Sequence, residues 1–157
     1  MKILPNLALV LLAVAALVAG CSSSGGSHHA GTTASAAPPI AAGAPVCAYL
    51  APADVHRFGD HVSYPGKPGH QDYGRTCDYG GAVFTLIDAN VSDKAFTYGA
   101  TKQVAGIGDR AYYNSEWHWF RVASKGTRFE LKCILCSDPE LAAMTAVARS
   151  LVARLPG

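Results

Sequence analysis

The sequence predicts an α+β domain in which a mainly antiparallel sheet carries a C-terminal helix on one face. Two observations lead to this prediction: a hairpin pattern over residues 117–135 and a helical apolar pattern over residues 137–155. The composition suits a globular chain, because 50% of the 157 residues are hydrophobic and 15% are charged. A formal net charge of only +2 gives no basis for nucleic-acid binding, so no nucleic-acid partner is expected.

The hairpin places its turn at Lys125-Gly126 and pairs residues 117–123 with residues 127–135. One side of this hairpin is then mostly apolar, and the other combines an opposite-charge pair with aromatic and aliphatic residues. The pairs are Val122–Phe129, Phe120–Leu131 and His118–Cys133 on the first side, and Arg121–Glu130, Trp119–Lys132 and Trp117–Ile134 on the second. We expect Trp119 and Lys132 to form a cation–π pair. A slip of one residue would reverse both faces, so the register is strongly specified.

The C-terminal helix is predicted from its cap and its periodicity. Ser137 and Glu140 have the spacing of a capping box, and Pro139 suits a first helical turn. Apolar residues then recur at helical spacing. They are Leu141, Met144, Ala148, Leu151 and Leu155. This stripe is expected to cover the apolar side of the sheet.

The other elements show weaker patterns. They are a short helix over residues 50–55, strands over 75–79 and 82–87 joined by Gly80-Gly81, a helix over 92–103 and a strand over 109–113. The second hairpin sets Cys77 opposite Phe84. Residues 60–74 contain three Gly and two Pro, so they are predicted to form a loop.

Residues 1–20 have the layout of a secretory signal peptide, with Lys2 before an apolar run from Leu7 to Ala19. This run is shorter than the roughly 20 apolar residues that cross a bilayer. Residues 17–21, Leu-Val-Ala-Gly-Cys, resemble the lipobox of bacterial lipoproteins. The resemblance implies cleavage before Cys21 and acyl chains on its thiol, which anchor the protein to a membrane. The alternative is an ordinary secreted protein in which Cys21 is unpaired.

Residues 21–45 comprise this cysteine and a predicted flexible tether rich in Ser, Gly, Ala and Pro, with Ile40 as its one large aliphatic residue. Residues 46–157 are predicted to form a single disulfide-linked domain. Because of the predicted signal peptide and lipid anchor, the protein is expected to be exported and attached to the cell membrane or to an outer membrane. In a two-membrane cell, Ser22 after the lipidated cysteine favours the outer membrane, by resemblance to known sorting behaviour.

Four cysteines remain in the domain, and three pairings are open. We favour Cys47–Cys77 and Cys133–Cys136, because export exposes the domain to an oxidising compartment. The second pair requires the chain to turn at Ile134-Leu135, since residues three apart in an extended chain lie too far from each other. The alternative is a thiol-redox or metal site formed by Cys133, Cys136 and His118. A fourth ligand is not evident, so no metal or cofactor is expected.

A surface of Trp117, Trp119 and Ile134 beside Lys132 is the candidate binding face, unless another strand or loop covers it. The partner would be an envelope protein, a glycan or a lipid. No phosphate loop or Gly-x-Ser-x-Gly motif is present. Two of the three glutamates, Glu130 and Glu140, are assigned structural roles. The protein is therefore not expected to be an enzyme.

Several short motifs together resemble a family of small bacterial envelope lipoproteins, well represented in actinobacteria, whose domain has no assigned function. They are the lipobox and tether, Cys47 to Leu50, Pro52 to Val55, Cys77-Asp78-Tyr79, the stretch from Val104 to Tyr112 and the final helix. The resemblance implies a binding or structural role in the envelope and supplies no catalytic residue. Cys133 and Cys136 depart from the family pattern.

Overall fold

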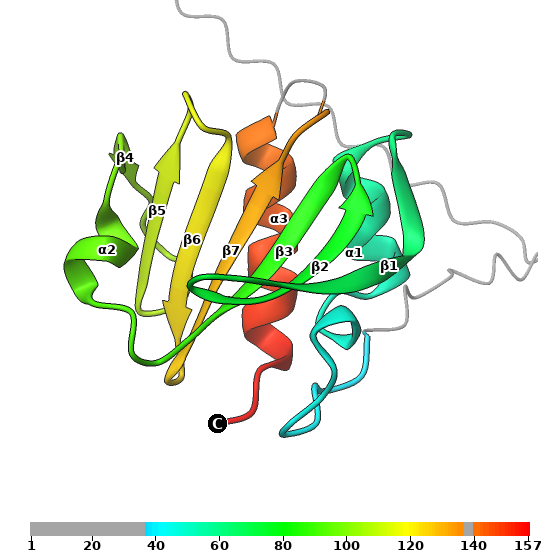
Figure 1. Ribbon diagram of the computed structural model, residues 1–157, viewed down its shortest axis with the longest axis horizontal. Helices are drawn as coiled ribbons and strands as arrows, with labels where there is room; N and C mark the ends of the chain where they lie inside the picture. Colours follow the sequence, from blue (N-terminus) through cyan, green and yellow to red (C-terminus); the bar gives the residue numbers. More distant parts are fainter. Residues whose placement is uncertain (1–36, 137–139) are drawn as a thin grey trace, which may run out of the picture. The chain divides into compact units, whose positions relative to one another are not determined.

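The fold is an antiparallel sheet with one long helix on a single face, as the sequence predicts (Figure 1). The computed structural model describes residues 37–136 and 140–157. Its strands are β1 (Val62–Gln71), β2 (Gly74–Gly80), β3 (Ala82–Ile87), β4 (Lys102–Gln103), β5 (Arg110–Asn114), β6 (Trp119–Ser124) and β7 (Thr127–Cys133). Its helices are α1 (Pro52–Val55), α2 (Asp93–Thr97) and α3 (Glu140–Arg154), with 3-10 turns at Val46–Ala48 and His56–Phe58. The strands pair in the order β1-β2-β3-β7-β6-β5-β4.

The β6–β7 hairpin has the predicted register from Trp119 to Ser124. The predicted pairs His118–Cys133 and Trp117–Ile134 are not formed as strand pairs, because β6 begins at Trp119 and His118 has a φ angle of 54°. Val122 pairs with Phe129 and Phe120 with Leu131, while Arg121 pairs with Glu130 on the opposite face. The turn residues Lys125 and Gly126 have φ angles of 50° and 74°. Two positive φ angles match the right-handed twist of the flanking strands, which explains why this turn closes the hairpin.

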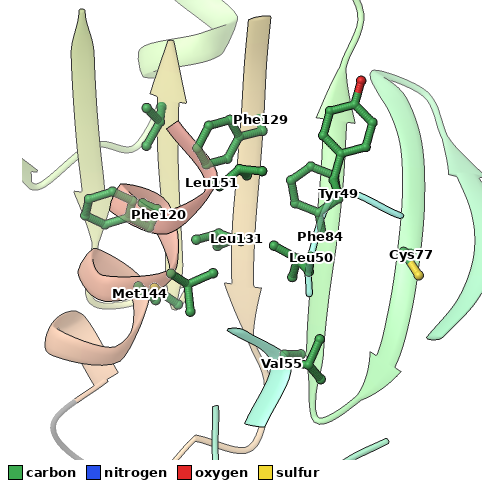
Figure 2. Close-up of a cluster of buried hydrophobic side chains, with 14 of the residues drawn as sticks. Tyr49, Leu50, Val55, Cys77, Phe84, Phe120, Phe129, Leu131, Met144 and Leu151 are labelled. Atoms are coloured by element: carbon green, nitrogen blue, oxygen red, sulfur yellow. The ribbon is translucent and has the colours of Figure 1, made fainter. Parts of the chain in front are cut away.

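The core lies between α3 and the inner face of the sheet, where aromatic and aliphatic side chains meet (Figure 2). Met144, Ala148 and Leu151 of α3 are fully buried, as the predicted stripe requires, while Leu141 is only partly buried. Val147, which lies outside the predicted stripe, is buried as well. The sheet contributes large side chains from its central strands. They are Phe84, Phe120, Val122, Phe129 and Leu131. The predicted β2–β3 register is also confirmed, since Cys77 pairs with Phe84.

The end of α3 is fixed to the start of the domain by a buried ion pair. Arg154 lies 2.6 Å from Asp54 of α1 and donates a second hydrogen bond of 2.9 Å to the Tyr49 carbonyl. The Arg154 carbonyl accepts a hydrogen bond from the Ile40 N–H, and the Ile40 side chain is buried. Ile40 thus contacts the folded domain, although it lies in the segment that the sequence predicts to be a flexible tether. Ile40 packs on the core instead of lying in a free tether.

Both predicted disulfides are present. Cys47 and Cys77 have a Cα–Cα distance of 5.1 Å, and the Tyr79 hydroxyl donates a hydrogen bond to the Cys47 carbonyl beside them. Burial raises the pKa of Tyr79. Cys133 and Cys136 have a Cα–Cα distance of 5.6 Å. The chain bends between them as expected, because the N–H groups of residues 134 and 135 both donate to the Gly81 carbonyl.

Residues 60–74 were expected to form a loop, but most of them belong to the edge strand β1. Its side chains are almost all exposed, so it lacks the alternation of apolar and polar residues that reveals a strand. Pro65 and Pro68 fit here because an edge strand needs hydrogen bonds on one side only. The same prolines hinder another chain from pairing with this edge.

The predicted helix over residues 92–103 is too long. Helix α2 covers only Asp93–Thr97, with the Ser92 hydroxyl accepting a hydrogen bond from the Ala95 N–H as its cap. Gly99 has a φ angle of 75°, which ends any helical path, and residues 102–103 form β4 against β5. Residues 92–103 contain too few apolar residues at helical spacing to sustain a helix beyond its first turn.

The signal peptide, the lipobox with Cys21 and the capping residues Ser137 and Pro139 lie outside the described residues. In the described part of the chain, the structure contains no helix with both the length and the apolar character that a membrane crossing requires.

We predict that Leu131→Ala lowers the free energy of unfolding by about 2–5 kcal/mol, because it leaves a cavity where Leu131 is fully buried. Leu135→Ala is the matched control and is expected to change stability by less than about 0.5 kcal/mol, since Leu135 is mostly exposed. Chemical denaturation of both variants tests this prediction. Equal losses would show that the core is not where the structure places it.

Candidate functional site

The outer face of the sheet, opposite α3, carries a buried polar cluster. Arg121 Nε lies 2.6 Å from Glu130 Oε2, and the Tyr73 hydroxyl donates a 3.0 Å hydrogen bond to Glu130 Oε1. Tyr73 lies at the tip of the β1–β2 hairpin, which crosses this face in front of the central strands (Figure 1). Burial, together with the charge of Glu130, raises the pKa of Tyr73 to about 12. The cluster therefore fastens the hairpin tip to β7.

Arg121 also joins helix α2 to the sheet. Its guanidinium donates hydrogen bonds of 3.1 Å to the carbonyls of Ala95 and Phe96, near the C-terminal end of α2. It lies 4.2 Å from the ring centroid of Trp119. The predicted cation–π pair between Trp119 and Lys132 is thus a Trp119–Arg121 contact, because Arg121 lies two residues along the same strand and on the same face.

The predicted binding face is only partly exposed. Trp119 is 3% exposed beneath Arg121, so it is not available to a partner. Lys132 is exposed, as are four large apolar side chains, which we call the apolar rim. The rim consists of Tyr98 (66% exposed), Trp117 (44%), Ile134 (56%) and Leu135 (56%). Tyr98 and Leu135 were not part of the predicted face.

Trp117 is held in place by the turn between β5 and β6. Its N–H donates a 2.5 Å hydrogen bond to Asn114, and the Asn114 amide in turn donates to the Gly99 carbonyl. The Trp117 ring lies 5.8 Å from that of Tyr98, centroid to centroid. A Cβ at Gly99 would meet the Trp117 ring at 2.6 Å, so glycine is needed for this close approach. Two segments far apart in sequence thus form one aromatic pair.

The Cys133–Cys136 disulfide lies beside a histidine–carboxylate pair. His118 Nδ1 is 2.7 Å from Glu140 Oε2, and the His118 carbonyl accepts a hydrogen bond from the Cys133 N–H. The sequence placed His118 next to Cys133 but did not identify Glu140 as its partner. In the disulfide, neither sulfur is a thiolate that could ligate a metal. Over residues 37–136 and 140–157, no three His, Cys, Asp or Glu residues gather as metal ligands.

A cleft of about 530 Å³ lies at the other end of the sheet, by the turn that joins β6 and β7. Arg75, Asp88 and Asp109 line it, together with Arg110 and Arg128. The last two are already engaged, because both donate to Asp93 at the start of α2.

The pKa of Asp93 is lowered from its usual value, mainly by its hydrogen bonds with Arg110. Among the described residues, the side chains of Arg75 and Asp88 have no ion pair or hydrogen bond. The cleft therefore presents uncommitted groups of both signs. Sequence reasoning missed it, because Asp88 could not be positioned from the sequence.

No protein-family model, curated protein or solved structure matches this chain. The resemblance to envelope lipoproteins therefore stays a prediction based on short motifs.

We predict that stability decreases between about pH 10 and pH 12, in part because of Tyr73. Its pKa rises from 10.0 to about 12 on folding, so the unfolded chain loses this proton first and is favoured as the pH rises. Tyr73→Phe should reduce this loss. Tyr98→Phe, at an exposed tyrosine, should leave it unchanged. Denaturation curves at several pH values measure the effect, and equal slopes for wild type and Tyr73→Phe would contradict it.

Protein purified without reductant is expected to contain no free thiol at Cys47, Cys77, Cys133 or Cys136, because all four are paired. Thiol labelling in denaturant followed by peptide mapping tests this, with Cys47–Cys77 as the internal reference for a buried bridge. Labelled Cys133 and Cys136 beside an intact Cys47–Cys77 bridge would contradict a structural bridge. That result would favour the thiol-redox alternative.

Proposed function

We propose that this protein is an exported envelope lipoprotein, anchored through Cys21, whose disulfide-linked domain acts as a binding or structural module. One observation supports this proposal above the others. The two disulfides pair four of the five cysteines, and the fifth is the cysteine of the lipobox. Structural disulfides form in oxidising compartments, so they favour export. Acylation then gives Cys21 a role that a free thiol outside the cytoplasm would lack.

The domain offers two surfaces for a partner, at opposite ends of the sheet. The cleft presents Arg75 and Asp88 without partners among the described residues, which suits a polar ligand that both donates and accepts hydrogen bonds. The apolar rim suits a hydrophobic one. Glu130 and Glu140, by contrast, are engaged by Arg121 and His118. This arrangement favours binding over catalysis.

Cys21→Ser is expected to abolish incorporation of labelled fatty acid and to release the protein from the membrane fraction. The physical reason is that two or more acyl chains hold a protein firmly at a bilayer, at roughly 0.8 kcal/mol per buried CH₂. Ser22→Ala is the matched control and should retain both the label and the membrane location. Expression in a bacterial host, with fatty-acid labelling and mass spectrometry of the mature N-terminus, provides the measurement. A mature chain with an unmodified Cys21, or one that still begins at Met1, would contradict the anchor.

A further inference from the structure

The four side chains of the apolar rim lie at one end of the sheet. Strand β7 ends at Cys133, so Ile134 and Leu135 follow at that end, where they bond to Gly81 between β2 and β3. The turn between β5 and β6 reaches the same end, because Asn114 pairs with Trp119 and Trp119 with Lys132. This turn contains Trp117, and Tyr98 contacts its ring. The segments that follow α2, join β5 to β6 and follow β7 thus place exposed apolar side chains at one end of the sheet.

The composition of this end matches that of proteins at a bilayer surface. Trp and Tyr favour the headgroup level, where an apolar ring and a polar tip are both satisfied. Ile134 and Leu135 are consecutive aliphatic residues on a bend outside the strands. Their side chains can therefore enter the boundary between headgroups and acyl chains without breaking hydrogen bonds between strands. Lys102 and Lys132 are exposed at the same end, paired with Tyr113 and Trp119 in the sheet. Their flexible stems can reach lipid phosphates.

The length of chain outside the described domain allows this end to face the membrane. The domain's first described residues lie at the opposite end, since Ile40 bonds to Arg154 at the end of α3. Helix α3 has 15 residues, which corresponds to about 22 Å. Fifteen residues lie between Cys21 and Ala37, so the covalent reach from one to the other is at most roughly 55 Å. A lipid on Cys21 can therefore lie in the bilayer that the rim contacts.

We propose that the apolar rim docks on the surface of the bilayer that holds the lipid anchor, with Trp117 at headgroup depth. This inference rests on the proposed anchor at Cys21. The domain is then fixed to the membrane at two points, by its acyl chains and by the rim. The second contact orients the sheet, so that the charged cleft at the opposite end faces away from the lipid.

The two tryptophans provide the test. Full-length lipidated protein is reconstituted in vesicles of phosphatidylcholine and phosphatidylglycerol with acyl chains brominated near the headgroup. We expect the wild type to lose tryptophan emission relative to unbrominated vesicles. Trp117→Phe should lose none, because its remaining Trp119 is buried in the domain. Replacing both Ile134 and Leu135 with Ser should reduce the quenching of Trp117. Tyr64→Ser is the control, because Tyr64 is an exposed aromatic residue outside the rim, and it should leave the quenching of Trp117 unchanged.

Flotation of the same samples separates the two proposals. Protein that floats with the vesicles and shows no quenching overturns the docking of the rim while the anchor stands; a rim reserved for a protein partner gives this result. Equal quenching in wild type and Trp117→Phe also overturns it. Protein that does not float overturns the anchor, and the docking with it.

Discussion

The register of the β6–β7 hairpin is the constraint on which the rest of the structure depends. It places Phe120, Val122, Phe129 and Leu131 against α3 and leaves Arg121 and Glu130 on the opposite face. A slip of one residue would bury two charges in the core and expose four large apolar side chains. Burying the charges of Arg121 and Glu130 in the core would cost much free energy, so the observed register is strongly preferred over the slipped one.

The outer face shows how a single charged pair can organise several elements. Glu130 receives Arg121 from the neighbouring strand and Tyr73 from the tip of a distant hairpin. The same guanidinium covers Trp119 and bonds to the end of α2. The cost of removing both charges from water offsets much of their attraction, so the pair itself adds little to stability. Removing one partner would leave the other charge buried and unpaired, so the pair fixes the position of these elements. These contacts cover the outer face around Trp119, and the two candidate surfaces for a partner lie at the ends of the sheet.

The two ends have different chemistry, and this difference connects the fold to the proposed function. One end presents the charged cleft, near the end of α3 to which the first described residues are bonded. The other presents the apolar rim, beside the Cys133–Cys136 disulfide that fixes the bend carrying Ile134 and Leu135. A domain with a polar end and an apolar end suits a protein placed between a membrane and the solution outside it.

The sequence by itself determined the fold class, the central hairpin registers and the stripe of α3, and it favoured the two observed disulfides among three open pairings. These depend on local periodicity and on spacing along the chain, which a single sequence displays directly. It did not reveal β1, whose side chains are nearly all exposed, nor the burial of Ile40, whose N–H donates a hydrogen bond to the Arg154 carbonyl. Only the tertiary structure decided that Trp119 is covered while Trp117 is exposed, and that Tyr98 joins it. The physical reason is that the exposure of a side chain depends on what packs over it. Arg121 covers Trp119, and the direction of the Arg121 side chain is set by its bonds to Glu130 and to α2, which the sequence does not specify.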